Sequence, residues 1–380
     1  MCTRVLWNSN DLAVLTGRSM DWPESTEPLI VAFPAGRRRD GGALAGVDVV
    51  PRNPLRWTSR YATLVTSVYG LGGIDGFNEK GLAGHGLYLQ STDFGVRNPA
   101  EPGVHAGMWL QYLLDQAATV SEALALMDGL DVVMVGAHGH DATIHLALED
   151  ASGDSAIIEF DHGTPVVHHG RQYTLMTNDP TYDEQLALLA EQDFSQPSRD
   201  MPLPGNVNAV DRFQRAAYYS ALLPEPRDER QAVAGVLAIM RNVSVPFGAP
   251  YGEFGVYNTE YRTVCDLTNR VYFFELTTSP NTIWVSFDDL TLDDGGDPLI
   301  VDPYDETMVG NVTGRMTPGL IGFFPRTASD TRATHAPVSN IVISGSMPVL
   351  PITVTVLALR ASHSTVGGAG LEAMFMVPPP

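Results

Sequence analysis

Cys2 directly follows the initiator methionine, and it combines a residue type and a position that can do chemistry. If an aminopeptidase removes Met1, one residue carries both a thiol and a free α-amine. The thiolate is a strong nucleophile, and an α-amine with an ordinary pKa of about 7.7–8.0 can serve as its general base. The alternative is that Cys2 packs as a small apolar residue.

Two charged residues shortly after Cys2 could support such a nucleophile. The positive charge of Arg18 could favour the thiolate over the thiol, and Asp21 could hold and orient the α-ammonium group. If residues 3–8 and 12–16 form a hairpin, Arg18 and Asp21 come to lie beside the N-terminus. The alternative is an ordinary surface ion pair between Arg18 and Asp21.

Three more polar groups, far away in the sequence, could complete a site for acyl transfer. Asn178 ends an apolar run just before a proline. Its side-chain amide could donate to a developing oxyanion, although turn chemistry also explains an Asn there. The glycine-rich stretch ending in Tyr88 allows close backbone approach, so the Tyr88 N–H could be a second donor. Arg212, near an expected helix start, could face the site, and Arg215, one turn on, is the competing choice.

Other kinds of catalytic and metal site are not supported by the sequence. It contains no His-Glu-x-x-His, no Cys-x-x-Cys, no Walker-type phosphate loop and no Gly-x-Ser-x-Gly. His138 and His140, and His168 and His169, lack partners at ligand spacing, so we interpret them as loop or surface residues. We therefore predict neither a metal nor an organic cofactor. Cys265, the second of two cysteines, is expected to be a free core thiol.

Hydrophobic patterning predicts blocks of strands and helices that follow one another. Apolar residues recur at helical spacing between Met108 and Ala117, and Thr119 with Glu122 forms a capping box that opens a second helix. Further helices are expected at residues 183–192, 208–222 and 230–240. Strands are expected at residues 3–8, 29–33, 62–68, 82–89, 143–148, 155–161, 164–168, 173–177, 259–267, 270–276 and 282–288. This order does not alternate as βαβ units do, and it favours an α+β layered fold.

Composition and charge narrow the class of protein and its partners. With 44% hydrophobic and 18% charged residues, the 380-residue chain suits a globular protein with a sizeable core. The 23 Lys and Arg against 44 Asp and Glu give a net charge of −21, which disfavours nucleic acid and anionic membrane surfaces as partners.

The C-terminal part differs in composition from the rest. We expect a main domain over residues 1–325 and an extension of uncertain structure over residues 326–380. Residues 341–359 carry no charge and are long enough for a membrane span, but Pro348 and Pro351 argue against a lipid-exposed helix. A peripheral strand pair or a poorly ordered tail is expected instead. No secretory signal precedes Cys2, so we expect a cytoplasmic protein, or a periplasmic one if the numbering starts at a processed form.

Several short motifs, each modest alone, form a specific ordered set over residues 1 to about 290. The set resembles the choloylglycine hydrolase / penicillin V acylase family of N-terminal nucleophile hydrolases. The matching pieces are Met1-Cys2-Thr3, Arg18-Ser-Met-Asp21-Trp22, Asn78-Glu-Lys-Gly-Leu82, Ser152-Gly-Asp-Ser-Ala156, Ile158-Glu159, Thr177-Asn178-Asp-Pro180, Leu203-Pro-Gly205, Arg212-Phe213 and Ser244-Val-Pro246. The resemblance implies a four-layer αββα sandwich, autocatalytic exposure of the N-terminal Cys and hydrolysis of linear amides.

The resemblance also implies a role for each site residue and a small-molecule N-acyl amide as substrate. The roles are Cys2 as nucleophile with its own amine as base, Arg18 and Asp21 flanking it, Asn178 and the Tyr88 backbone as oxyanion hole, and Arg212 completing the polar cluster. Members of the family are typically homotetramers.

Trp22 and Tyr88 look like the penicillin acylase side of the family, where they could wall an apolar acyl pocket. We expect penicillin V acylase-like or N-acyl-homoserine lactone acylase activity. The alternatives are hydrolysis of conjugated bile salts and a catalytically silent homologue that binds an acyl ligand.

Overall fold

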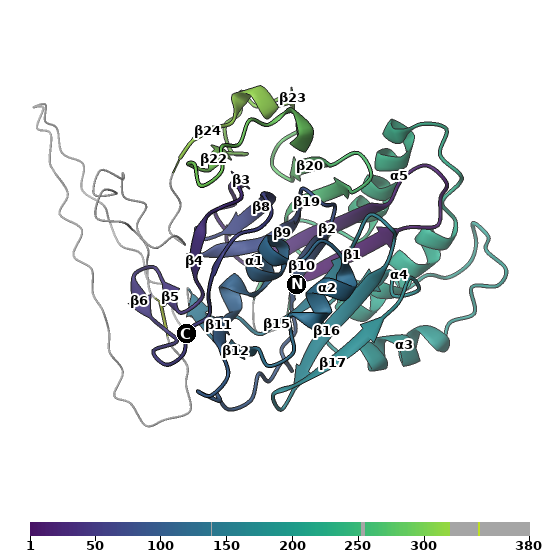
Figure 1. The fold of residues 1–380 in the computed structure, drawn as a ribbon. Helices are drawn as coiled ribbons and strands as arrows, with labels where there is room; N and C mark the ends of the chain where they lie inside the picture. The colour runs from purple at the N-terminus through teal and green to yellow at the C-terminus, as the bar shows by residue number, and fades with distance from the viewer. Residues whose placement is uncertain (138, 252–254, 320–340, 343–380) are drawn as a thin grey trace, which may run out of the picture.

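The strand that begins at Cys2 carries the N-terminus into the middle of the protein (Figure 1). In the computed structural model, which describes residues 1–137, 139–251, 255–319 and 341–342, β1 (Cys2–Trp7) pairs antiparallel with β2 (Leu15–Trp22). The hairpin expected from the sequence is present. Its second strand continues beyond the expected end at Thr16 and includes both Arg18 and Asp21. Both strands are almost entirely buried.

The strands form two large sheets that pack face to face. The seven-stranded sheet is antiparallel apart from its last pair, and its spatial order is β18 (Leu175–Met176), β1, β2, β19 (Asn258–Asp266), β20 (Val271–Leu276), β21 (Thr282–Ser286) and β23 (Gly310–Asn311). The nine-stranded sheet has the order β17 (Thr164–His169), β16 (Ser155–Asp161), β15 (Ile144–Glu149), β10 (Ala83–Tyr88), β9 (Gly72–Asn78), β8 (Thr63–Val68), β3 (Ile30–Phe33), β22 (Leu299–Val301) and β24 (Thr317–Pro318).

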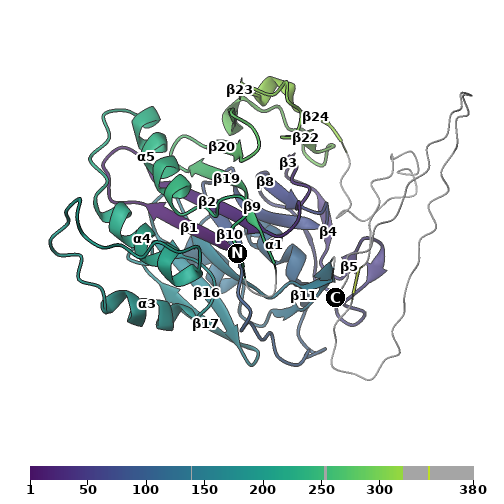
Figure 2. The ribbon, with the colours of Figure 1, turned by 180° about the vertical axis from the view of Figure 1, so that it is seen from behind.

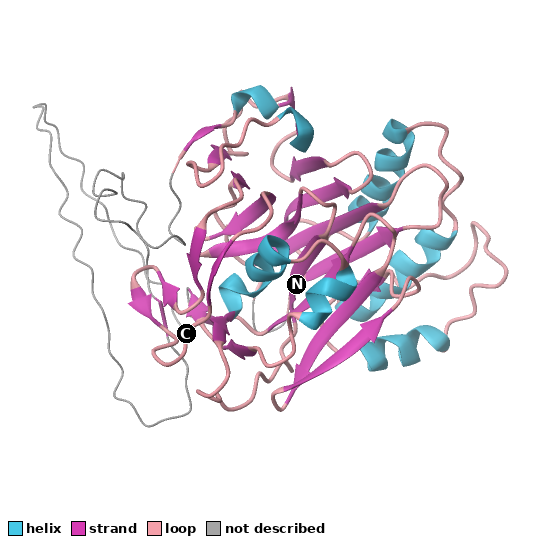
Figure 3. Cartoon of the chain, in the orientation of Figure 1, coloured by secondary structure: helices cyan, strands magenta, loops and turns pink. Residues whose placement is uncertain are grey.

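Helices cover the outer face of each sheet. On the seven-stranded sheet, α4 (Ala209–Ala221) packs on β1 and α5 (Glu229–Asn242) packs on β2 and β19, with α3 (Tyr182–Ala190) beside α4. On the nine-stranded sheet, α1 (Ala106–Gln116) packs on β9 and β10, with α2 (Val120–Ala125) beside α1. The two views in Figures 1 and 2 and the colouring of Figure 3 show these layers. The fold is the αββα sandwich expected from the sequence.

Short strands form small additional sheets outside the two large ones. They are β11 (Gly103–His105) with β12 (Asp131–Val133), β4 (Arg38–Asp40) with β7 (Arg56–Thr58), β5 (Ala43–Leu44) with β6 (Val47–Asp48), and β13 (Gly136–Ala137) with both β14 (His140–Asp141) and β25 (Ile341–Val342). Apart from β25, nearly all of the C-terminal extension lies outside the described residues, as do the other residues of the segment 341–359. No helix in the described part of the chain is long and apolar enough to cross a membrane.

The helix starts follow the expected capping chemistry. The Thr119 side chain accepts a hydrogen bond from the Glu122 N–H at 3.2 Å at the start of α2, and the Glu122 carboxylate accepts from the Ala118 N–H at 2.8 Å. Asn208 caps α4 by accepting from the Asp211 N–H, also at 2.8 Å. The capping box read from the sequence is therefore confirmed, with its return bond displaced by one residue.

Strand β9 was not expected, because glycines weaken a strand pattern. Its glycines are required by packing rather than by local preference. A Cβ atom on Gly72 would lie 1.9 Å from the carbonyl oxygen of Gly107 in the first turn of α1. A side chain at Gly72 would therefore push α1 away from the sheet.

We expect Gly72→Ala to lower the free energy of unfolding by about 1–3 kcal/mol, as overpacking against a backbone atom usually does. The matched control is Gly314→Ala, because a Cβ at Gly314 meets nothing within 4 Å and its φ is not positive. Denaturant titration of both variants measures the difference. Equal stability of the two variants would show that α1 does not pack closely against the backbone of β9 at Gly72.

Candidate active site

The pairing of β1 with β2 distributes the predicted site over two faces of one sheet, because side chains alternate along a strand. Cys2 lies opposite Met20, and its side chain shares a face with Met20 and Arg18. This face looks towards the nine-stranded sheet, since Arg18 donates to a β10 carbonyl. Thr3 and Asp21 lie on the other face, towards α4. The thiol therefore lies on the face towards the nine-stranded sheet, and the groups that hold the backbone around it lie on the face towards α4.

Arg18 lies beside the sulfur of Cys2. Its Nη2 is 3.5 Å from the Cys2 Sγ and donates to the carbonyl of Gly86 at 3.2 Å, while its Nη1 donates to the hydroxyl of Tyr261 at 2.7 Å. Although burial alone would lower it, the pKa of Arg18 is raised by Tyr261, Cys2 and Asp75. A fixed positive charge therefore lies next to the sulfur of Cys2.

On the other face of the sheet, Arg212 of α4 contacts three groups of the site, which are the Cys2 carbonyl, the Asp21 carboxylate and the Asn178 side chain. Its Nη1 donates to the carbonyl of Cys2 at 2.6 Å, and lies 3.4 Å from a carboxylate oxygen of Asp21. Its Nη2 donates to the side-chain oxygen of Asn178 at 2.9 Å. Arg215, the competing choice, donates instead to two loop carbonyls near the start of α4. Of the two arginines, Arg212 is the one that reaches the site.

Asn178 lies just beyond β18, the neighbour of β1. Its Oδ1 accepts from the Cys2 N–H at 2.6 Å, and its Nδ2 donates to the Tyr88 carbonyl at 2.5 Å. The Leu89 N–H donates to the carbonyl of Thr143, the residue before β15. Because successive residues of a strand direct their N–H and carbonyl groups to opposite sides, the backbone groups of Tyr88 face away from β15. The Tyr88 backbone and the Asn178 side chain thus meet next to Cys2, and their roles as oxyanion donors stay predictions.

Met1 is itself buried and occupies the end of this strand pair. Its α-ammonium donates to the Asp21 carbonyl, and the Asp21 N–H donates back to the Met1 carbonyl at 2.8 Å. The expected contact of the Asp21 carboxylate with the α-ammonium of Cys2 requires the chain without Met1 and stays a prediction. The carboxylate accepts instead from Thr259 and approaches Arg212. Burial lowers the pKa of the Met1 ammonium.

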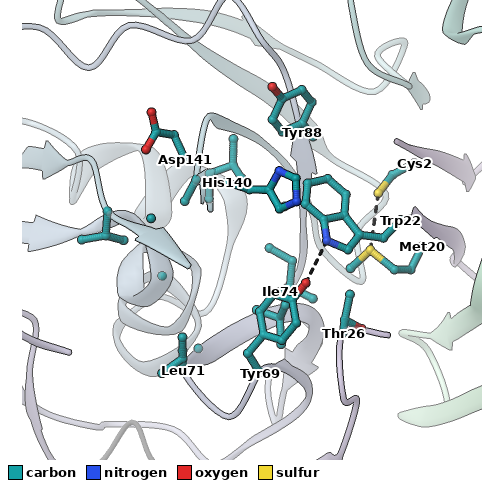
Figure 4. A pocket seen from close by; sticks show the side chains of 18 of the residues that line it. Cys2, Met20, Trp22, Thr26, Tyr69, Leu71, Ile74, Tyr88, His140 and Asp141 are labelled. Atoms are coloured by element: carbon teal, nitrogen blue, oxygen red, sulfur yellow. Dashed lines mark hydrogen bonds between the residues drawn. The ribbon is translucent and has the colours of Figure 1, made fainter. Parts of the chain in front are cut away.

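An apolar pocket that is open to solvent begins at the thiol. Its rings are arranged around Trp22, whose Nε1 donates to the Tyr69 hydroxyl at 2.8 Å and whose ring lies edge-on to His140 at 5.1 Å and tilted to Tyr88 at 5.8 Å. Figure 4 shows the sulfur atoms of Cys2 and Met20 beside this indole. The pocket can take an uncharged acyl group next to the nucleophile.

A chain of buried charges crosses between the two sheets behind the site. Arg4 of β1 pairs with Glu149 at 2.5 Å, and His85 of β10 bridges Glu149 at 2.6 Å and Asp75 at 2.5 Å. Although burial alone would lower it, Glu149 and Asp75 raise the pKa of His85 to about 9. Burial alone would raise the pKa of Glu149, but Arg4 and His85 lower it to about 2. The chain therefore alternates in charge at neutral pH.

Sequence reasoning missed several residues around the site. His140 was interpreted as a loop or surface histidine, but it lines the pocket against Trp22. Tyr69 and Met20 also line it, and His85 gave no signal of its buried ion pairs. Only the alternation of β2, once its length was known, could have placed Met20 beside Cys2. Cys265 is a free buried thiol, as expected.

The described residues contain no group of three or more His, Cys, Asp or Glu side chains placed to hold a metal ion. The groups that the structure brings together are a thiol, an arginine, a side-chain amide and an apolar cavity. This combination suits transfer of an acyl group to sulfur.

Comparisons with known proteins point to the same chemistry. A family model described as linear amide C–N hydrolases, choloylglycine hydrolase family, matches residues 2–301, which include every side chain of the site. A penicillin V acylase from Pectobacterium atrosepticum is 37% identical over 310 residues, covering 75% of this chain and 80% of that relative.

Solved structures agree with the fold. A penicillin V acylase from Agrobacterium tumefaciens has a TM-score of 0.75 at 36% identity, covering 84% of this chain and 98% of its own. A conjugated bile acid hydrolase from Clostridium perfringens shares the fold with a TM-score of 0.65 at 20% identity, over 81% of this chain and 98% of its own.

The buried His85 predicts a pH-dependent stability. The pKa of about 9 in the folded chain lies above the ordinary histidine pKa of 6.5. The proton on His85 therefore stabilises the fold fully below pH 6.5, and this contribution is lost as the pH rises through about 9. Glu149 stays ionised throughout this window. We expect His85→Gln to cost more stability at about pH 6 than at about pH 9.5, by on the order of 3 kcal/mol.

Urea titrations at both pH values measure this difference. The control is His162→Gln, because His162 also faces a carboxylate, Asp93, at 2.7 Å, but its side chain is 87% exposed and solvent screens the pair. If the loss in free energy of unfolding caused by His85→Gln is the same at both pH values, as expected for His162→Gln, His85 is not charged.

Proposed function

The chain belongs to the choloylglycine hydrolase family of linear amide C–N hydrolases, and on that premise we propose that Cys2 accepts the acyl group of an N-acyl amide once Met1 has been removed. The observation that carries the proposal is the meeting of Arg18, Asn178 and Arg212 around the first residue of β1. The substrates we propose are phenoxyacetyl amides of the penicillin V type and N-acyl-homoserine lactones.

In the first step, the Cys2 thiolate attacks the amide carbonyl while Arg18 stabilises the thiolate. The carbonyl oxygen becomes an oxyanion and accepts hydrogen bonds from the Asn178 amide and the Tyr88 N–H. The α-amine of Cys2 has taken the proton of the thiol and is an ammonium at this point. As the C–N bond breaks, this α-ammonium gives the proton to the departing nitrogen, and a thioester remains on Cys2.

In the second step, water attacks the thioester carbonyl and gives its proton to the α-amine. The C–S bond breaks, the thiolate of Cys2 is restored and the carboxylic acid leaves. The side chains of Arg212 and Asp21 have positioning roles in both steps. Arg212 holds the carbonyl of Cys2 and the side chain of Asn178, and the Asp21 carboxylate lies beside the Arg212 guanidinium.

The shape and lining of the pocket support the substrate class. Its walls are aromatic or aliphatic near Cys2, with Trp22 and Tyr88 beside the thiol and Ile74 and Leu71 further in. Such walls suit an aryloxy ring or a medium alkyl chain. A steroid carries hydroxyl groups that need polar partners, so bile salt hydrolysis is the second candidate.

A catalytically silent state is favoured by one observation. While Met1 is bonded to Cys2, the Cys2 nitrogen is a peptide N–H that donates to Asn178, and the proposed base does not exist. The chain in that state can bind an acyl ligand in the pocket but cannot turn it over.

We expect the chain without Met1 to hydrolyse penicillin V or a medium-chain N-acyl-homoserine lactone faster than glycocholate. Cys2→Ala should abolish the activity, and Cys2→Ser should reduce it strongly, because a hydroxyl is a far poorer nucleophile at neutral pH. Intact mass establishes removal of Met1 in each preparation, and release of the amine measures the rate.

The matched control is Cys265→Ala, which removes the other buried thiol of the same sheet and should keep the activity. Activity that survives in Cys2→Ala, or hydrolysis of none of the three amides by the processed chain, would refute the mechanism.

Arg212 and Arg215 provide a second test, because they lie one turn apart on α4. We expect Arg212→Ala to lower kcat/KM by on the order of 100-fold through misplacement of Cys2 and Asn178. Arg215→Ala should change kcat/KM by less than about threefold, since Arg215 holds only loop carbonyls.

Steady-state kinetics and thermal unfolding of both variants separate an effect on the site from an effect on stability. Arg212→Lys, which keeps the charge but not the forked geometry, should recover part of the activity. Equal losses in the Arg212 and Arg215 variants would contradict the placement of Arg212.

A further inference from the structure

Met1 is held in the structure much as a ligand would be. It exchanges two backbone hydrogen bonds with Asp21, one in each direction. Its side chain is only 8% exposed and packs in a small cluster with Ala209, Tyr257 and Tyr251. The two tyrosine rings are stacked, with centroids 4.3 Å apart. A defined space around Met1 is therefore built from β2, the start of α4 and the segment that leads into β19.

This space lies where the proposed general acid delivers its proton. The nitrogen of Cys2 already directs one hydrogen to Asn178 at 2.6 Å. When water hydrolyses the Met1–Cys2 peptide bond, this nitrogen becomes a free amine whose N–H bonds rotate about the Cα–N bond. To receive a proton from it, the departing nitrogen must lie within hydrogen-bond distance of the Cys2 nitrogen. The space that Met1 fills adjoins this nitrogen, so it is where the structure offers room for the departing amine.

The acyl pocket lies on the opposite side of the strand. Side-chain alternation sends Cys2 towards the apolar pocket and Met1 towards α4. An amide whose carbonyl carbon is at the Cys2 sulfur can thus place its acyl part in the pocket around Trp22 and its amine part in the space of Met1.

The backbone of Asp21 defines what this space can recognise. Its N–H donates to the Met1 carbonyl at 2.8 Å and its carbonyl accepts from the Met1 ammonium, so both groups lose their partner when Met1 leaves. A backbone N–H buried at this depth needs a new acceptor. The stacked rings of Tyr251 and Tyr257 offer a flat apolar wall for a compact ring or short side chain.

We propose that the space of Met1 becomes the leaving-amine subsite of the processed chain, and that it selects amines with a carbonyl or carboxylate on the carbon next to the nitrogen. The Asp21 N–H donates to that oxygen, and Tyr251 and Tyr257 contact the rest of the amine. This inference rests on the proposed function, because it requires that Cys2 transfers an acyl group from an amine.

The test uses the full chain without Met1, verified by intact mass, and measures binding of single products by NMR titration. L-homoserine lactone carries the required carbonyl, cyclopentylamine has a ring of similar size without it, and phenoxyacetate probes the acyl pocket. We expect the lactone to bind roughly tenfold more tightly than cyclopentylamine, since only the lactone satisfies the Asp21 N–H.

Variants on the two sides of the strand make the test specific. Tyr257→Ala should weaken binding of the lactone roughly tenfold and change binding of phenoxyacetate less than about twofold, and Trp22→Ala should do the reverse. Tyr251→Ala, at a half-buried position, gives a second variant that should fold if Tyr257→Ala does not.

Equal binding of the two amines, or lactone binding that neither tyrosine variant weakens, would overturn the subsite. That result leaves the proposed function intact if amides are still hydrolysed. Lactone binding that depends on both tyrosines in a processed chain that cleaves no amide would instead support the subsite as a binding site and refute the proposed function.

Discussion

The register between β1 and β2 is the constraint on which the site depends. It places Cys2 opposite Met20 and Thr3 opposite Ser19. Because side chains alternate, this register puts the thiol and Arg18 on the face of the second sheet, and Asp21 on the face of the helices. A slip by one residue would exchange the two faces and bury the thiol against α4. Arg212 opposes such a slip, because it binds the carbonyl of Cys2 from the helix side.

Buried charges tie this register to the second sheet. Arg4 reaches Glu149 from β1, and Arg18 reaches the carbonyl of Gly86 from β2. Gly86 directly follows His85, whose ring is fixed between Glu149 and Asp75. Arg4, Glu149, His85 and Asp75 each have a partner of opposite charge. Removal of one partner would leave an uncompensated buried charge, which is strongly destabilising. The orientation of the arginine beside the sulfur is therefore set partly by groups that never meet a substrate.

The sequence allowed much of this arrangement to be predicted, and the reasons for the rest are physical. Thr119 and Asn208 mark helix starts by local capping chemistry, which a short stretch of sequence contains. The residues around Cys2 could be named because the family resemblance supplied their order. Strand β9 could not be predicted, because Gly72 serves close contact with a helix that lies far along the chain. His140 looked like a surface histidine because only the tertiary fold brings Trp22 against it. The homotetramer stays a prediction.

The burial of Met1 also restricts when Met1 can be removed relative to folding. A peptidase needs an accessible, extended N-terminus, whereas here the terminal ammonium and its side chain are enclosed by β2, α4 and the stacked tyrosines. The removal of Met1 that the proposed function requires therefore has two routes, cleavage while the chain is still emerging from the ribosome or cleavage by the neighbouring thiol after folding. For the same reason an affinity tag fused to the N-terminus would have to displace this packing, so recombinant production calls for a tag elsewhere in the chain.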